Sequence, residues 1–178
     1  MITRYAANVK GSRVLREFLA SSWLPEQNRG WTTTDDDPED AMPITLNPYL
    51  NFRGTAREAL EFYHAIFGGT LNISTFADYQ ASEDPAEADL VMHGQIDGPG
   101  LTIMAADVPA HMDYQGISGV SVSISGDDDA TIRGYWDGLA EGGTVVQPLE
   151  VAPWGDAFGM LVDRFGASWL VNISGTAA

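Results

Sequence analysis

Apolar positions along the chain recur in two ways, with the alternation of a β-strand and with the spacing of an α-helix. Segments of the two kinds follow one another in the same order in both halves of the chain. The pattern predicts a strand over Thr45–Phe52, which Pro48 weakens toward an edge or bulge position. A helix follows, because apolar residues then recur at helical spacing as far as Phe67, where Gly68–Gly69 ends them. Three further strands are predicted at Thr70–Phe76, Leu90–Ile96 and Leu101–Ala106.

The start of that helix carries a recognisable signal. Thr55 stands at the predicted N-cap and Glu58 follows three residues later, an arrangement typical of a capping box. The sequence therefore predicts that the Thr55 side chain caps the helix.

The second half of the chain repeats the same order. Val120, Val122 and Ile124 alternate with serines, which is typical of a half-buried strand. An aspartate-rich segment then begins a predicted helix, where negative charge suits the helix N-terminus, and Gly142–Gly143 ends it. Three strands are predicted at Thr144–Val151, Phe158–Asp163 and Ser168–Ile173. The two glycine pairs lie 74 residues apart, so an internal duplication explains the pattern.

The pattern predicts an α+β protein made of two βαβββ modules, at about residues 42–109 and 116–174. Each sheet would carry one helix on one face. Two such sheets that faced each other would leave a cleft between them, which is where small molecules usually bind.

Residues 1–41 differ from the rest and are predicted to be an extension. Apolar positions after Ser12 suit a short helix that ends at Pro25, and the residues from Gly30 are polar and acidic, as in a linker. We expect this extension to be partly helical or disordered, and the folded domain to cover residues 42–178.

Composition excludes several classes of function. The 178 residues carry 25 acidic and nine basic side chains, a net charge of −16, so a nucleic-acid or anionic-membrane surface is not expected. The absence of cysteine removes disulfides and thiolate chemistry. No apolar run is long enough to span a membrane, and a cytoplasmic location is the default expectation.

Several short sequence words, by their order and spacing, connect this layout to a known family. The words are Tyr49-Leu50-Asn51-Phe52-Arg53-Gly54, Glu58-Ala59-Leu60-Glu61-Phe62-Tyr63, Phe67-Gly68-Gly69, Met92-His93-Gly94, Met104-Ala105-Ala106-Asp107, Trp154-Gly155, Phe158-Gly159, Asp163-Arg164-Phe165-Gly166 and Trp169-Leu170-Val171-Asn172. With them the chain resembles the vicinal oxygen chelate superfamily, which includes glyoxalase, bleomycin-resistance and dioxygenase proteins. It looks most like the PhnB-like branch, whose members often carry a demethylubiquinone methyltransferase name.

The resemblance implies a paired half-barrel with a central cleft, and a homodimer in which the partner can complete that cleft. Metal-dependent members hold a divalent ion with His, Glu or Gln from the first and last strands of each module. Here the corresponding positions carry other residues: Asn47, Tyr49, Asn51, Thr102, Met104, Ala106, Ser121, Ser123 and Leu170. We therefore expect no tightly held metal and no other cofactor, although weak binding of a divalent ion stays open.

Several residues are candidates for catalysis or ligand binding in the predicted cleft. His93 and Gln95 lie two positions apart on one strand and so share a face, which makes His93 a candidate general base. An apolar or aromatic ligand would contact the other candidates, which are Tyr49, Met104, Trp154, Phe158 and Trp169. Trp154 is the strongest of them, because core packing explains a loop tryptophan poorly.

Two functions follow from these residues. The first is a binding protein that holds a small apolar or aromatic compound in its cleft without a tightly held metal. The alternative is a divalent-metal-dependent lyase, isomerase or dioxygenase of the same superfamily with His93 as base. The methyltransferase name gains no support, since the sequence shows no glycine-rich strand–turn–helix for a nucleotide.

Overall fold

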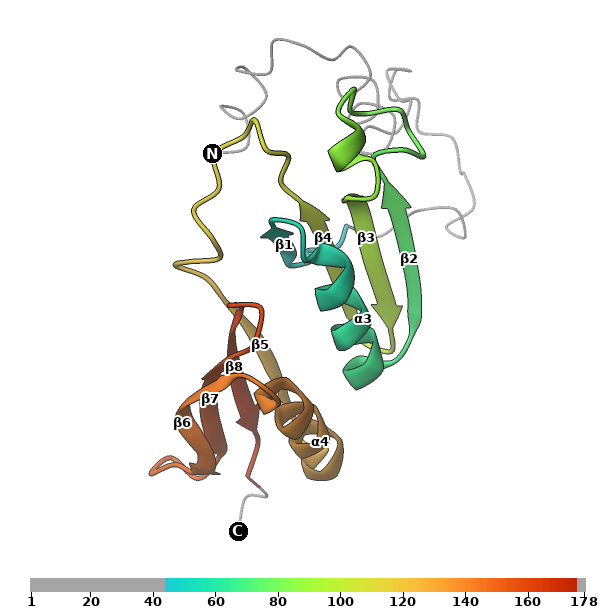
Figure 1. Cartoon of the computed structure of the whole chain (residues 1–178). Coiled ribbons are helices and arrows are strands. Elements are labelled where there is room, and N and C mark those ends of the chain that lie inside the picture. Colours follow the sequence, from blue (N-terminus) through green and yellow to red (C-terminus); the bar gives the residue numbers. More distant parts are fainter. Residues whose placement is uncertain (1–43, 176–178) are drawn as a thin grey trace, which may run out of the picture.

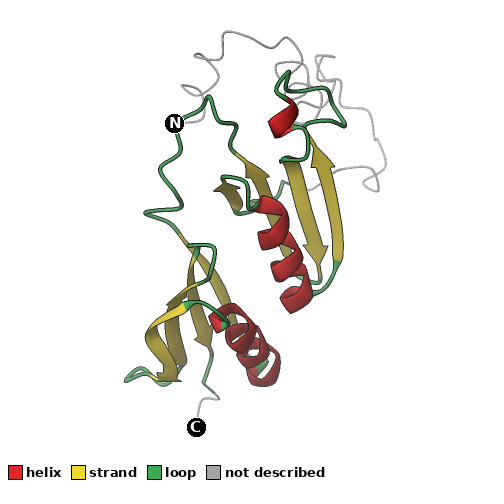
Figure 2. Ribbon diagram, in the orientation of Figure 1, coloured by secondary structure: helices red, strands yellow, loops and turns green. Residues whose placement is uncertain are grey.

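A computed structural model describes residues 44–175, which form two modules of the same element order (Figures 1 and 2). The extension over residues 1–41 lies outside the described residues. The first module consists of β1 (Tyr49–Phe52), α3 (Ala56–Phe67), β2 (Thr70–Thr75), a short 3₁₀ helix η2 (Pro85–Glu87), β3 (Val91–Gly98) and β4 (Leu101–Asp107). The second consists of β5 (Ser121–Gly126), α4 (Asp129–Ala140), β6 (Thr144–Val151), β7 (Ala157–Val162) and β8 (Ser168–Ile173).

The two sheets share one topology. Their strand orders are β1-β4-β3-β2 and β5-β8-β7-β6, and in each the first strand pairs in parallel with the last strand of its own module. The other neighbours are antiparallel. The α+β class and the two βαβββ modules predicted from the sequence are confirmed. The first strand is shorter than predicted and begins just after Pro48, which has no backbone N–H to donate.

Each helix covers one face of its own sheet with the apolar residues that the periodicity marked. On α3 the buried residues are Ala56, Ala59, Leu60, Phe62, Tyr63 and Phe67, and on α4 they are Ile132, Trp136 and Leu139. The residues of the described part form no helix that is both long and apolar enough to cross a membrane.

The N-termini of the two helices are capped in different ways. The capping box predicted at Thr55 is wrong, because the Thr55 side chain makes no capping hydrogen bond. Instead, the backbone N–H of Ala56 donates to the buried carboxylate of Asp107, at the end of β4, over 3.1 Å. The same carboxylate accepts the N–H of Val91 at 3.0 Å, so it joins the helix start to β3. In the second module Asp128 caps α4 directly by accepting from the N–H of Thr131.

The glycine pairs after the helices allow the chain to touch its own sheet. Gly69 has φ +91°, and a Cβ built on it would lie 2.4 Å from the carbonyl oxygen of Asp97. Gly143 stands in the same place in the second module, where an added Cβ would lie 2.6 Å from the carbonyl oxygen of Val162. The repeated Gly-Gly-Thr word thus reflects a close approach of backbone to backbone in both modules.

We expect Gly69→Ala to lower the free energy of unfolding by about 2–4 kcal/mol, since it combines a left-handed backbone with a steric clash. Gly68→Ala is the matched control, because Gly68 also has a positive φ of +70° but nothing lies within 4 Å of its added Cβ. Urea unfolding followed by circular dichroism measures both. Equal losses in the two variants would contradict the close-approach explanation.

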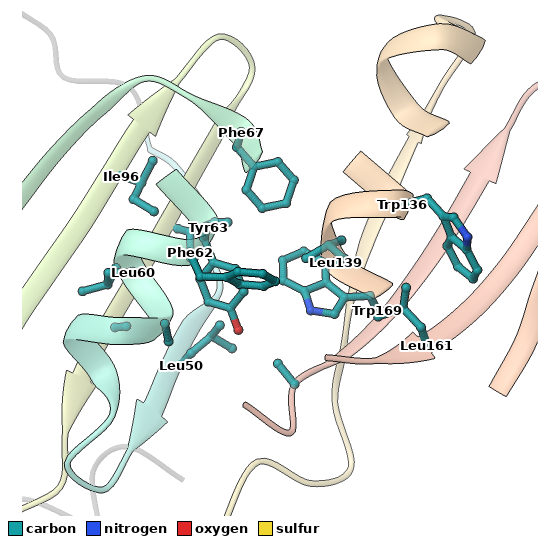
Figure 3. Close-up of a cluster of buried hydrophobic side chains, with 14 of the residues drawn as sticks. Leu50, Leu60, Phe62, Tyr63, Phe67, Ile96, Trp136, Leu139, Leu161 and Trp169 are labelled. Atoms are coloured by element: carbon teal, nitrogen blue, oxygen red, sulfur yellow. The ribbon is translucent and has the colours of Figure 1, made fainter. Parts of the chain in front are cut away.

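The modules pack against each other through their helix-bearing faces. In Figure 3 the aromatic side chains of α3 lie beside Trp169 of β8 and Leu139 of α4. The ring centroids of Tyr63 and Trp169 are 5.6 Å apart, and those of Phe67 and Tyr135 are 5.0 Å apart. Between the helices an added Cβ on Gly138 would lie 2.9 Å from Ile66, so that glycine allows α4 to approach α3. One continuous core therefore spans both modules.

A buried carboxylate stands at this junction. Asp163, which is 4% exposed, accepts the hydroxyl of Tyr63 at 2.6 Å and the Nε1–H of Trp169 at 2.8 Å on one oxygen. Its other oxygen accepts the backbone N–H groups of Phe165 and Ala167 at 2.9 and 3.0 Å. Burial and the neighbouring carboxylate raise the pKa of Tyr63 far above its usual value, so the phenol stays protonated as the donor. Asp163 thus joins the first module to the second.

Because the helix-bearing faces meet, the opposite faces of both sheets stay accessible. In β1 the exposed residues alternate with buried ones, and in β5 the serines at 121, 123 and 125 are exposed in the same way. We call these surfaces the first open face (β1, β4, β3 and β2, away from α3) and the second open face (β5, β8, β7 and β6, away from α4). Both are described below.

Candidate functional site

The first open face brings together four of the residues predicted for the cleft. The strand register places Tyr49, Met104 and Gln95 in one row across β1, β4 and β3. His93 lies two residues before Gln95 and projects from the same face, since Gly94 between them packs on Leu60 of the helix. The prediction that His93 and Gln95 share a face is confirmed, and Tyr49 and Met104 lie on that face too. That these residues contact a ligand stays a prediction.

Tyr49 and His93 interact directly across that face. The Tyr49 hydroxyl lies 3.3 Å from Nδ1 of His93, and the two ring centroids are 5.9 Å apart. Partial burial raises the pKa of the Tyr49 phenol, which therefore keeps its proton at neutral pH. Tyr49 is still 39% exposed, so the pair is available to a ligand.

Gln95 belongs to a second polar group on the first open face. Its amide nitrogen donates to both oxygens of Asp97, at 2.8 and 2.7 Å. The Thr102 hydroxyl donates to the same carboxylate at 3.1 Å. The amide orientation follows from the acceptor-only carboxylate and leaves the Gln95 side-chain oxygen without a hydrogen-bond partner among residues 44–175. Sequence reasoning missed Asp97, although its position two residues after Gln95 on the strand marks the same face.

The second open face supplies apolar and aromatic side chains. Phe158, Met160, Leu170 and Asn172 share it, because the register pairs Phe158 with Asn172 and Met160 with Leu170. All four are half-buried. Trp154 lies in the loop between β6 and β7 with its ring centroid 5.8 Å from that of Phe158, and it is 62% exposed. Trp154 and Phe158 thus form one aromatic pair on this face, and their contact with a ligand stays a prediction.

The loop that carries Trp154 is held by Asp156. Its carboxylate accepts the amide of Asn172 at 3.0 Å and the backbone N–H of Gly175 at 2.9 Å. These bonds, that of Gly175 first, lower the pKa of Asp156 below its usual value. Asp156 was not predicted from the sequence, because nothing along the chain indicates that Asn172 and Gly175 come near it.

Trp169 does not belong to this surface, and its prediction as a ligand contact is wrong. It is 1% exposed and lies on the helix-bearing face of β8 with Val171 and Ile173. Its ring packs on Tyr63 and its indole N–H is used by Asp163. Trp169 is therefore a core residue of the junction between the modules.

Among the residues that the structure describes, potential metal ligands do not form a cluster. Across residues 44–175, no three His, Asp or Glu side chains lie together in a way that would hold an ion. Two carboxylates near the open faces, Asp97 and Asp156, are engaged by amide, hydroxyl and backbone donors. Glu150 of β6, which the register pairs with Phe158, adds one exposed carboxylate to the second open face. The expectation that no metal is tightly held stays a prediction, since the two faces of one chain do not meet.

Comparison with known proteins identifies the family of this chain. A family model described as 3-demethylubiquinone-9 3-methyltransferase matches residues 45–172, which include both modules and both open faces. The chain belongs to this family. The crystal structure of protein PA1353 from Pseudomonas aeruginosa is 37% identical, covers 75% of this chain and 100% of its own, and has a TM-score of 0.65.

Two further proteins are similar to this chain. A putative 3-demethylubiquinone-9 3-methyltransferase, PhnB protein, from Bacillus cereus is 22% identical, with a TM-score of 0.59 over 74% of this chain and 100% of its own. Protein YjdN of Escherichia coli (strain K12) is 25% identical over 142 residues, which are 73% of this chain and 95% of YjdN. The PhnB-like resemblance identified from the sequence words is confirmed.

Proposed function

We propose that this member of the family binds a small apolar or aromatic compound without a tightly held metal. The ligand would lie between the first open face of one chain and the second open face of a partner chain. The observation that carries the proposal is the pairing of an exposed aromatic surface, Trp154 with Phe158, with a polar surface around Tyr49 and His93.

The aromatic surface supports the ligand class. Soluble proteins seldom leave a tryptophan 62% exposed beside further apolar side chains unless something covers it. Trp154, Phe158, Met160 and Leu170 offer a ring pair and two flexible apolar side chains, which suit a planar apolar compound.

The packing of the modules supports the partner chain. Within one chain the two modules contact each other through their helix-bearing faces, so the first open face does not face the second open face of the same chain. A twofold dimer would place the first open face of each chain against the second open face of the other and would create two equivalent clefts. This is the homodimer that the family resemblance led us to expect.

The donor set supports the absence of a tightly held metal. His93 is the histidine of the first open face, and its Nδ1 is engaged by Tyr49. The second open face presents serine, asparagine and apolar side chains along β5 and β8. Such neutral oxygen and amide groups hold Mg²⁺ or Ca²⁺ weakly. The strands add Asp97 on the first open face, which Gln95 and Thr102 already engage, and Glu150 on the second, and neither belongs to a group of three ligands among the described residues.

Trp154→Ala is expected to weaken the binding of 2-acetylnaphthalene by about tenfold to a hundredfold, as removal of a central aromatic contact commonly does. Equilibrium dialysis measures the affinity. Arg133→Ala is the control, because Arg133 lies on α4, behind the sheet, and pairs there with Asp129.

Two results would contradict the proposed function. One is a wild-type protein that fails to bind 2-acetylnaphthalene and a panel of similar planar compounds. The other is tight, stoichiometric uptake of Mn²⁺, Ni²⁺ or Zn²⁺ in isothermal titration calorimetry together with turnover of lactoylglutathione, which would favour the metal-dependent lyase.

A further inference from the structure

We propose that Tyr49 is a positioning residue that fixes His93 as a hydrogen-bond donor through Nε2, so that the first open face selects ligands with a carbonyl-type acceptor oxygen. This inference rests on the proposed function and names the ligand chemistry of the same site. It also assigns to His93 a role other than that of a general base.

The geometry of the pair singles out one ring nitrogen. The Tyr49 hydroxyl approaches Nδ1 of His93 at 3.3 Å, across the strand β4 that separates their own strands. In the register, Gly94 pairs with Ala105, so His93 comes level with Ala106, whose small side chain leaves room for the two rings to meet. The contact therefore joins two strands that do not pair with each other.

The direction of this hydrogen bond follows from the chemistry of the two groups. A phenol is a good donor and a weak acceptor, whereas the bare nitrogen of a neutral imidazole is a strong acceptor. Burial keeps the phenol of Tyr49 protonated. Tyr49 therefore donates and Nδ1 accepts, which requires the proton of neutral His93 to be on Nε2.

The other ring nitrogen is free to meet a ligand. The structure gives Nε2 of His93 no hydrogen-bond partner among residues 44–175, and every buried side-chain nitrogen or oxygen there has one. Nε2 is therefore not buried. It presents an N–H group beside Tyr49 and Met104, so a ligand oxygen can accept from it while an apolar ring lies on the neighbouring side chains.

The same arrangement makes proton abstraction by His93 unfavourable. In the neutral imidazole the only basic nitrogen is Nδ1, and that nitrogen is occupied by the Tyr49 hydroxyl. A base at Nε2 would require the opposite tautomer, in which Nδ1–H would have to donate to the phenol oxygen, a weaker acceptor than imidazole nitrogen. Recognition of a ligand oxygen requires no such change.

The tautomer can be observed directly in the ligand-free protein. In long-range ¹H–¹⁵N spectra of protein labelled at histidine, at a pH where His93 is neutral, we expect Nε2 to carry the proton and Nδ1 to show the shift of an acceptor. The His93→Gln variant assigns the signal among the three histidines of the chain. Tyr49→Phe should turn this single tautomer into a mixture. A proton on Nδ1 in the wild type, or spectra that Tyr49→Phe leaves unchanged, would overturn the proposal.

Selectivity is tested with two probes of nearly equal shape, the ketone 2-acetylnaphthalene and the alkene 2-isopropenylnaphthalene. The alkene has a CH₂ group in place of the carbonyl oxygen of the ketone. We expect the wild type to bind the ketone about two- to tenfold more tightly, the usual worth of one neutral hydrogen bond. Tyr49→Phe should reduce this ratio and His93→Ala should abolish it, while His93→Gln, which keeps an N–H donor, should retain part of it.

The outcomes of the binding test separate this inference from the proposed function. Equal affinity of the wild type for the two probes would refute the role of His93 and leave the binding function standing. Failure of both probes to bind would instead contradict the proposed function, and the tautomer measurement would still decide the arrangement of the Tyr49–His93 pair.

Discussion

Replacing Asp163 by alanine is expected to lower the free energy of unfolding by about 3–5 kcal/mol, as the loss of a buried charged acceptor commonly does. The change would leave four donors without their acceptor: the Tyr63 hydroxyl, the indole N–H of Trp169 and the backbone N–H groups of Phe165 and Ala167. Each buried donor left unpaired costs about 1–3 kcal/mol, and these costs are not additive. Denaturant unfolding at neutral pH measures the loss.

Milder variants separate the two parts of the Asp163 network. Asp163→Asn can keep one oxygen for the backbone donors of its own turn, but its amide cannot accept from Trp169. Tyr63→Phe removes the donor that comes from the first module and leaves the turn intact. A double-mutant cycle between these two changes measures the coupling across the junction. Asp129→Ala is the surface control, because its ion pair with Arg133 is exposed and worth at most about 1 kcal/mol. A loss from Asp163→Ala no larger than that of the control would contradict the role assigned to Asp163.

The Asp163 network also matters to the site, although it contacts no open face. The bond from Tyr63 and the rings of Phe62, Phe165 and Trp169 set how the two sheets are oriented within a chain. The Arg164 guanidinium adds a contact between the modules, 4.2 Å from the centroid of the Phe62 ring. In the dimer that we propose, both open faces would meet their counterparts at once, so this orientation would decide whether two clefts can close.

Much of the fold could be predicted from the sequence because the same pattern occurs twice, once in each module. The alternation in β5 and the glycines after α3 and α4 are local signals, and the structure confirms them. The capping of α3 could not be predicted in the same way. Its acceptor, Asp107, lies 51 residues along the chain from Ala56, and Thr55 offered a plausible local substitute.

The candidate site was predictable where strand alternation alone decides the face, as for His93 with Gln95. The prediction for Trp169 was wrong because both faces of β8 carry large apolar residues. Alternation places Trp169 and Leu170 on opposite faces but does not indicate which of the two faces the helix. The roles of Asp163 and Asp156 depend on partners brought near by the tertiary fold. No spacing along the chain indicates those contacts.

The shared cleft that we propose makes a prediction that no single-chain site can satisfy. Met104→Glu on the first open face and Phe158→Glu on the second should each abolish the binding of 2-acetylnaphthalene, because each places a charge in every cleft of its own homodimer. When the two variants are denatured and refolded together, binding should return to about a quarter of all sites. In a mixed dimer, one cleft carries both glutamates and the other pairs two unaltered faces.

The reciprocal mixture distinguishes a shared cleft from one within a chain. Refolding the wild type with the double variant Met104→Glu/Phe158→Glu should give mixed dimers with no intact cleft, since each cleft then receives one altered face. A cleft formed within one chain would reverse both results: the two single variants would never complement each other, and the wild-type chain of each mixed dimer would keep its site. Light scattering on every mixture checks that dimers form, and a monomer at micromolar concentration would contradict the shared cleft outright. The crossed design therefore tests which two faces enclose the ligand without requiring that the natural ligand be known.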